Sequence, residues 1–166
     1  MAKILLGGTP TETNGDLPKI GNQLPDFELI NGEMRSVNLN FFKGNKLVLN
    51  IFPSVDTGVC SASVQSFNDR ASLLPDTRVL CISRDLPFAQ NRLCSKKDLN
   101  AVITLSDFKT GQFGRDYGVE IQSGAFAFLN ARAVVVANHL HQVVYTELVS
   151  EIGQSPNIEA ALNALN

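Results

Sequence analysis

The order of apolar and polar residues predicts a chain of short strands and helices. Strand-like apolar runs span residues 27–30, 37–39, 47–52, 78–82, 102–105, 126–129, 133–136 and 143–148. Helices are expected at 58–74, 87–94, 111–117 and 155–165, the second and the last with a proline in the first turn. The first twenty residues, a short apolar stretch followed by a polar one, predict a hairpin or an arm.

The arrangement of these elements indicates the fold class. The run from Leu47 to Phe52 is apolar except at Asn50, as expected of a strand that is buried on both faces of a sheet. Strands and helices alternate in the middle of the chain, and the last two runs form a hairpin. We therefore predict an α/β fold in which helices flank a central mixed sheet. No linker or repeat divides the 166 residues, so one domain over residues 1–166 is expected.

Composition narrows the classes of partner. The net charge is −2 and no basic block is present, which argues against nucleic acid and anionic membranes. The apolar stretch Ile4–Leu6 is too short for a signal peptide, and no run approaches the roughly 18 residues of a membrane span. A cytoplasmic chain is expected, in which a disulfide is usually catalytic. Three cysteines and two histidines do not form a zinc pattern, and neither a metal nor a cofactor is expected.

Cys60 is the candidate nucleophile. Thr57 suits the N-cap of the helix that follows, which places Cys60 in the first turn. Unpaired backbone N–H groups and the helix dipole favour a thiolate there, and the thiolate is the reactive form of cysteine. The Thr57 hydroxyl could accept a bond from the Cys60 N–H and donate its own proton to the sulfur. The alternative is an inert thiol on an apolar helical face, which is made of Cys60, Val64, Phe67, Ala71 and Leu74.

A cation is needed as well. Making an ordinary cysteine predominantly thiolate at neutral pH takes roughly 3.4 kcal/mol of preference for the charged form. A helix N-terminus contributes about 0.3–1 kcal/mol, and about 2 kcal/mol in a partly buried site. An arginine or lysine from elsewhere in the chain should supply the rest.

The segment from Pro53 to Cys60, P-S-V-D-T-G-V-C, matches the P-x-x-x-T-x-x-C signature of peroxiredoxins. The surrounding 50–53 and the later 80–90, L-C-I-S-R-D-L-P-F-A-Q, resemble the bacterial thiol peroxidase subfamily of atypical 2-Cys peroxiredoxins. The resemblance runs from about Gly21 to the C-terminus. It implies a thioredoxin-like fold, reduction of hydrogen peroxide and of alkyl or lipid hydroperoxides, and a peroxidatic Cys60 assisted by Pro53, Thr57 and an arginine.

The same resemblance assigns two more residues. Cys94, after the D-L-P-F-A-Q segment, is implied to be the resolving cysteine, which forms an intramolecular disulfide with Cys60. Taken alone, it could equally be a buried helical cysteine. Arg132, in A-R-A-V-V-V, is implied to be the activating cation, although an arginine that opens an apolar strand is usually a solvated strand end. Cys81, inside a predicted strand, is interpreted as inert core packing.

Two segments depart from the subfamily pattern. Residues 124–129 differ from its G-P-L-x-G-L, and 138–142 lack its usual acidic turn, where His139 and His141 are interpreted as exposed polar residues. The leading function is a thioredoxin-dependent peroxidase, and the resemblance also implies a homodimer. The alternatives are a redox-sensing protein that relays oxidation to a partner, and a disulfide reductase, which the lack of C-x-x-C disfavours.

Overall fold

The computed structural model describes residues 1–166 as nine strands, four α-helices and one 3-10 helix. The strands are β1 (Lys3–Leu6), β2 (Thr9–Glu12), β3 (Glu28–Asn31), β4 (Ser36–Asn38), β5 (Lys46–Ile51), β6 (Thr77–Ser83), β7 (Ile103–Ser106), β8 (Ala133–Ala137) and β9 (Val143–Leu148). The helices are η1 (Leu39–Phe42), α1 (Gly58–Ala71), α2 (Pro87–Lys97), α3 (Gln112–Asp116) and α4 (Ile158–Asn163).

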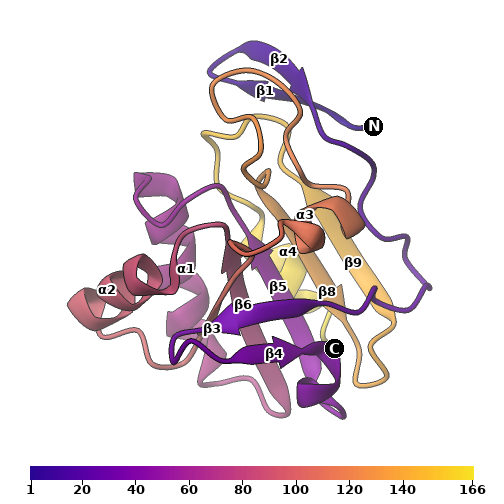
Figure 1. The fold of residues 1–166 in the computed structure, drawn as a ribbon. Coiled ribbons are helices and arrows are strands. Elements are labelled where there is room, and N and C mark those ends of the chain that lie inside the picture. The colour runs from indigo at the N-terminus through magenta and orange to yellow at the C-terminus, as the bar shows by residue number, and fades with distance from the viewer.

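Seven strands form the predicted mixed sheet, in the order β4-β3-β7-β6-β5-β8-β9. The central strands β5, β6 and β7 are parallel, and the other pairings are antiparallel. The predicted N-terminal hairpin is confirmed as a separate two-stranded sheet, β1–β2, which lies at the top of Figure 1. Its Leu5 exchanges backbone hydrogen bonds with Ser150 and Ile152, at 2.7 and 2.9 Å, which ties the hairpin to the segment after β9.

Alternating side chains of the central strands fill two separate cores. On β5, Leu47, Leu49 and Ile51 belong to the core that also holds α3 residues and the hairpin, whereas Val48 and the following Phe52 belong to the core beneath α1 and α4. This two-sided burial is what a continuously apolar run predicts. Figure 1 shows α1 and α2 together on one side of the sheet. All three cysteines lie in or against the core that α1 and α4 cover.

Two sequence predictions about elements were wrong. No strand forms at 126–129, because Gly124, at a φ of 83°, starts a turn in which the Leu129 N–H donates to Phe126 O at 3.0 Å. The short apolar run therefore reflects a folded-back loop, with Phe128 itself at a φ of 71°. The last helix begins at Ile158 with Asn157 as N-cap, so Pro156 precedes the helix instead of occupying its first turn. The helix starts after Asn157 because the Asn157 side chain accepts the Ala160 N–H, at 3.0 Å, and so caps the first turn.

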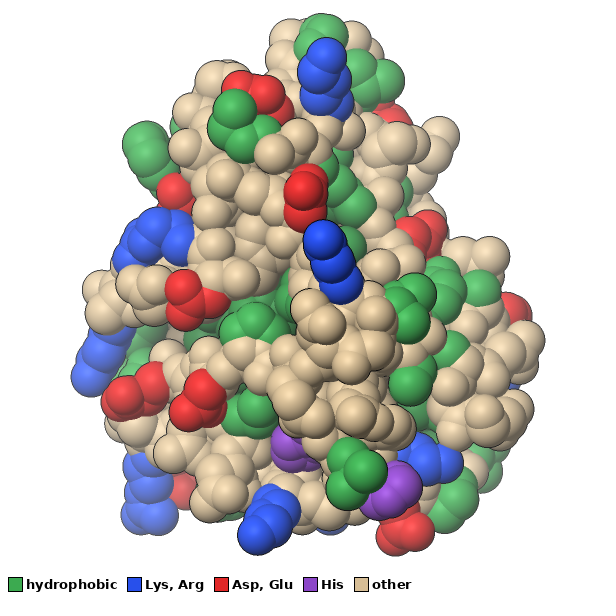
Figure 2. All heavy atoms as spheres, turned by 90° about the vertical axis from the view of Figure 1, so that its right-hand side faces the viewer, with side chains coloured by type: hydrophobic (Ala, Val, Ile, Leu, Met, Phe, Trp, Pro, Cys, Tyr) green, Lys and Arg blue, Asp and Glu red, His purple; other side chains and the backbone are tan.

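Helix lengths differ modestly from the prediction. Helix α1 ends at Ala71. Turns follow it, in which the N–H groups of Leu73 and Leu74 donate to the carbonyl oxygens of Arg70 and Ala71. Helix α2 ends at Lys97, and the residue that caps it, Asp98, has a φ of 55°. No helix is both long and apolar enough to cross a membrane. Charged side chains of both signs are scattered over the face shown in Figure 2 and do not form one patch of a single sign.

Candidate active site

The connection from β5 to α1 positions Cys60. Thr57 has an extended backbone, at φ −94° and ψ 144°, and its Oγ1 accepts the Cys60 N–H at 3.3 Å. The predicted N-cap is thereby confirmed, and Cys60 lies in the first turn with a side chain that is 0% exposed. Pro53 is also buried, directly after Phe52 at the end of β5. Cys60 therefore lies at the positive end of the helix dipole, where a thiolate is favoured.

The sequence suggested that the Thr57 hydroxyl could donate its proton to the Cys60 sulfur, but in the structure it does not. Oγ1 donates instead to the Ser54 carbonyl oxygen, at 3.2 Å, which also accepts the Thr57 N–H at 3.2 Å. A carbonyl oxygen is a stronger acceptor than a neutral sulfur, which is the physical reason for the difference. Thr57 therefore closes the 54–57 turn and caps α1 at the same time.

Arg132 is buried, which excludes the alternative that it is a solvated strand end. The residue is 2% exposed, and its Nε donates to the Ile152 carbonyl oxygen at 2.8 Å. Ala133 pairs with Ile51, which places Arg132 just beyond the end of β5, beside the start of the Cys60 loop. By strand alternation its side chain projects to the same face as Val134, which packs in the core that contains Cys60.

Arg132 is also free of carboxylate partners. Its Nη1 is buried without a hydrogen-bond acceptor from the protein, and a buried N–H that lacks an acceptor is costly. Arg84, the other largely buried arginine, pairs with Glu120 at 2.8 Å and with Asp107 at 3.4 Å. Those carboxylates neutralise Arg84. Arg132 is thus the buried cation whose charge is available to an anion.

Cys94 and Cys81 have different surroundings. Cys94 lies half-buried on α2. Burial raises the pKa of its thiol, and a hydrogen bond with the Thr104 side chain offsets part of that rise. Cys81 on β6 is fully buried, and burial raises its pKa to about 12, although the Asn50 Nδ2 donates to its sulfur at 3.8 Å. All three thiols are free in this structure. Cys60 and Cys94 are therefore not joined here, and each remains in its own helix.

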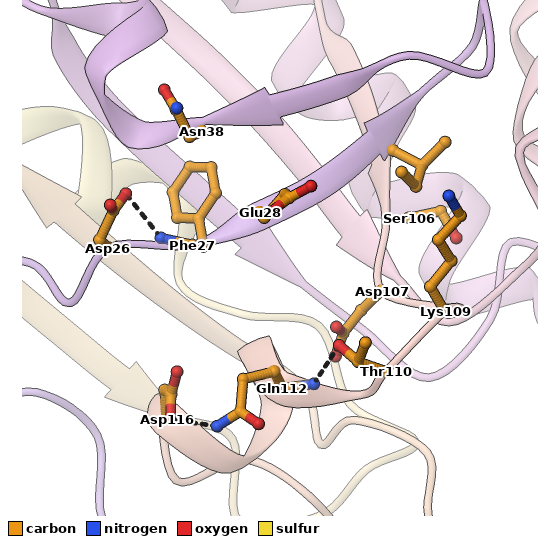
Figure 3. Close-up of a pocket in the computed structure, with 11 residues that line it drawn as sticks. Asp26, Phe27, Glu28, Asn38, Ser106, Asp107, Lys109, Thr110, Gln112 and Asp116 are labelled. Atoms are coloured by element: carbon orange, nitrogen blue, oxygen red, sulfur yellow. Dashed lines mark hydrogen bonds between the residues drawn. The ribbon is translucent and has the colours of Figure 1, made fainter.

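Two cavities differ in their relation to these residues. One, of about 270 Å³, lies between the start of α1 and the exposed side of α2, and Thr57 and Leu93 help to line it. Residues of both cysteine-bearing helices line this cavity, but neither Cys60 nor Cys94 does. The other, of about 480 Å³, lies between β3 and the loop before α3, and its polar lining includes Asp26, Asp107 and Lys109 but no candidate residue (Figure 3).

Sequence reasoning missed Asp85. Its carboxylate accepts hydrogen bonds from the Ser54 Oγ at 2.7 Å and from the Val55 N–H at 2.8 Å, both in the loop that leads to Cys60. The D-L-P-F-A-Q segment that carried the resemblance contains this residue, but a lone aspartate gave no sign of such contacts. Neither His139 nor His141 belongs to a group of three or more His, Cys, Asp or Glu side chains that could hold a metal ion.

Comparisons with known proteins agree with this geometry. The sequence profile of the redoxin family matches residues 19–162. The chain is 48% identical over 166 residues to a thiol peroxidase from Corynebacterium glutamicum, covering all of both chains. It is also 48% identical over 165 residues to a thiol peroxidase from Mycobacterium tuberculosis, covering 99% of each.

Solved structures show the same fold. A peroxiredoxin-like protein from Aquifex aeolicus superposes with a TM-score of 0.92 at 31% identity, covering 98% of this chain and 95% of that one. A thiol peroxidase from Chromobacterium violaceum has a TM-score of 0.88 at 20% identity, covering 97% and 93%. The thioredoxin-like fold expected from the sequence is confirmed.

Proposed function

Because this chain belongs to the redoxin family and is a thiol peroxidase of that family, we propose that Cys60 is the residue that reduces the peroxide. The observation that carries the proposal is the pairing of two features at the end of β5. Cys60 lies in an N-capped first helical turn, and the buried, carboxylate-free Arg132 lies just beyond the same strand end. A helix N-terminus and a cation are the two kinds of group that the energy estimate calls for.

The first chemical step is displacement at oxygen. The Cys60 thiolate attacks the terminal oxygen of a hydroperoxide, an S–O bond forms, and the O–O bond breaks. The products are Cys60 sulfenic acid and an alkoxide, which takes a proton and leaves as the alcohol, or as water when the substrate is hydrogen peroxide. The planar guanidinium of Arg132 can stabilise the negative charge that develops on the leaving oxygen. Pro53 fixes the backbone at the start of the loop.

The second step forms a disulfide. Cys94 attacks the sulfenic sulfur, a disulfide forms within the chain, and the hydroxyl leaves as water. A disulfide needs Cα atoms within about 7 Å, and we propose that helices α1 and α2, whose cysteines are not joined here, open locally to reach it. The cavity between these helices and the exposed outer side of α2 support such an opening. A dithiol reductant, for which we propose thioredoxin, then returns both thiols, and a strained disulfide favours this exchange.

We also propose a homodimer in the cytoplasm, which acts on hydrogen peroxide and on alkyl or lipid hydroperoxides. Support for association comes from three exposed apolar side chains on neighbouring segments, Leu86, Phe88 and Phe128. Arg84 connects these segments, because its Nη1 donates to the Phe128 carbonyl oxygen. Large exposed apolar groups of this kind often mark an interface.

The test is peroxide consumption by the full chain with thioredoxin, thioredoxin reductase and NADPH. Repeated turnover that Cys60→Ser abolishes would support the proposal, with little change in the free energy of unfolding. A stoichiometric reaction that oxidises Cys60 once and then passes the disulfide to another protein would favour the redox sensor instead. Full activity in Cys60→Ser would contradict the assignment of Cys60.

A further inference from the structure

We propose that Asp85 is a positioning residue for the peroxide step, one that holds the loop before Cys60, residues 53–57, in its reactive geometry. The proposal rests on the proposed role of Cys60. Asp85 follows the C-terminal end of β6, and its half-buried carboxylate reaches across to the loop between β5 and α1. No other acidic side chain in the structure hydrogen-bonds to residues 53–57.

Both oxygens of this carboxylate are used. Oδ1 accepts the hydroxyl proton of Ser54 at 2.7 Å, and Oδ2 accepts the Val55 N–H at 2.8 Å. Oδ2 also accepts the Ser83 hydroxyl. Hydrogen bonds to a charged acceptor are shorter and roughly twice as strong as neutral ones, so these contacts fix the loop more firmly than serine–backbone bonds would.

The contacts continue to the sulfur-bearing residue. The Ser54 carbonyl oxygen accepts both the N–H and the hydroxyl proton of Thr57, and Thr57 in turn accepts the Cys60 N–H. Asp85 is thus three residue-to-residue steps from Cys60, through Ser54 and Thr57. A displacement of Ser54 would move the helix cap, and the cap sets where the first turn of α1 begins.

Asp85 is itself held rigidly. Its carbonyl oxygen accepts the Ser106 hydroxyl at the end of β7, and Ser83 connects it to the buried Gln90 of α2. Gln90 Nε2 donates to Ser83 Oγ at 3.1 Å and to the Leu105 carbonyl oxygen at 2.9 Å. The loop that leads to Cys60 is therefore bound to the Asp85 carboxylate directly, and the start of the helix that carries Cys94 is bound to it through Ser83. This makes the first turn of α2 a fixed point from which its exposed outer end can open.

Removal of the carboxylate should slow the reaction with peroxide far more than a reaction without directional demands. Asp85→Ala leaves the Ser54 hydroxyl and the Val55 N–H without their acceptor. A reacting group displaced by about 1 Å can lose about 100-fold in rate. Alkylation of Cys60 by monobromobimane should not fall by more than about threefold, because it requires the buried thiolate to become exposed but needs no aligned O–O bond.

The experiment uses the full chain in a Cys94→Ser background, so that oxidation stops at the sulfenic acid. Rapid quench with mass spectrometry gives the rate constant for hydrogen peroxide, and bimane labelling gives the alkylation rate. We expect a loss of about 100-fold for Asp85→Ala in the peroxide rate alone. Asp85→Asn should lie between Asp85→Ala and the parent, because its amide keeps one acceptor oxygen. Asp69→Asn, an exposed carboxylate farther along α1 that bonds only to Gln65, is the matched control and should equal the parent.

Three results separate the possibilities. A peroxide rate within about threefold of the parent in Asp85→Ala, in a protein that needs Cys60, overturns the positioning role. Peroxide and alkylation rates that fall together with the melting temperature also overturn it, because they show a general loss of structure. Peroxide reduction that persists in Cys60→Ser contradicts the proposed function instead. If Asp85→Ala does not fold, Ser54→Ala removes the bond from the Ser54 hydroxyl to Asp85, together with the bond that this hydroxyl accepts from the Asp56 N–H. A parental peroxide rate in that variant is likewise fatal to the proposal.

Discussion

The backbone N–H of Cys60 donates to Oγ1 of Thr57 at 3.3 Å, and the same Oγ1 donates its proton to Ser54. Thr57 therefore performs two structural tasks with one hydroxyl group. It caps the helix that begins at Gly58, and it closes the turn that leads into that helix. The sulfur of Cys60 receives no hydrogen bond from the Thr57 hydroxyl, so in the proposed mechanism its activation falls to the helix N-terminus and to Arg132.

Thr57→Val should lower both stability and reactivity, because valine keeps the shape but lacks the acceptor. Loss of an N-cap costs about 1 kcal/mol in the free energy of unfolding. If that cost falls on the first turn of α1, the rate of the peroxide step should drop about fivefold. Thr57→Ser keeps the hydroxyl and should remain close to the wild type. Urea denaturation and single-turnover peroxide kinetics measure the two effects, and a Thr57→Val protein with wild-type kinetics would show that the cap does not matter for reactivity.

Arg132→Met should slow the peroxide step by about 100-fold, the effect of losing one donor at a developing negative charge. Methionine keeps an apolar stem in this buried position, so the fold should persist. Arg132→Lys should recover only part of the rate, because an ammonium group lacks the planar fork of donors. The pH dependence of Cys60 alkylation should shift to higher pH in Arg132→Met, since thiolate becomes harder to form.

Arg84 offers the matched control for that experiment. Its guanidinium is bound to Glu120 and Asp107, so Arg84→Met should destabilise the protein without shifting the pH profile of Cys60 alkylation. Unchanged alkylation and peroxide rates in Arg132→Met would mean that another cation activates the site.

Peroxide should join Cys60 to Cys94 within one chain and leave Cys81 free. Cys81 is the more deeply buried of the two possible partners, and burial raises its pKa to about 12, so it stays a thiol. Burial also raises the pKa of Cys94, so the disulfide-forming step should become faster as the pH rises above neutrality and thiolate accumulates. Non-reducing peptide mapping identifies the bridge. A dominant bridge to Cys81, or one between chains, would contradict the assignment of Cys94, whereas Cys94→Ser should consume one equivalent of peroxide and stop as a sulfenic acid.

Patterns that depend on neighbours in sequence were the predictable part of this protein. The both-faces-buried run at 47–52, the cap at Thr57 and the hairpin at the end of the sheet all follow from local spacing, and the structure has each of them. The run at 126–129 misled because four apolar residues are too few to separate a strand from a packed turn, which only the positive φ of Gly124 and Phe128 reveals. The final helix was misplaced because Pro156 and Asn157 both suit a helix start.

The candidate site was predictable only where the interacting residues lie close together in the sequence. Cys60 and Thr57 lie three residues apart, so helix geometry connects them. The surroundings of Arg132 were not accessible in that way, because its burial depends on the Ile152 carbonyl oxygen and on the pairing of β8 with β5. Asp85 was missed for the same reason, since its partners lie about thirty positions earlier in the chain.

The buried Cys81 predicts how stability depends on pH. In the folded protein its thiol, which accepts a weak hydrogen bond from Asn50, has a pKa of about 12, whereas an exposed cysteine in an unfolded chain titrates near about 8.5. Below about pH 8.5 both states hold the proton and its contribution is complete. Between about 8.5 and 12 the unfolded chain loses the proton first, so it binds fewer protons than the native state. The free energy of unfolding must then fall as pH rises, by up to about 1.4 kcal/mol per pH unit from this group.

Cys81→Ala should remove that slope, since alanine does not titrate. The comparison is the free energy of unfolding in urea between pH 7.5 and 10, under reducing conditions, for the wild type and the variant. Val79→Ala is the matched control, because Val79 lies on the same strand, faces the same core and leaves a small cavity without removing a thiol. It should lower stability at every pH and keep the wild-type slope. Titration of Cys94 and of the tyrosines is common to all three proteins and cancels. Equal slopes for Cys81→Ala and the wild type would show that the Cys81 thiol ionises as easily in the folded protein as in the unfolded chain.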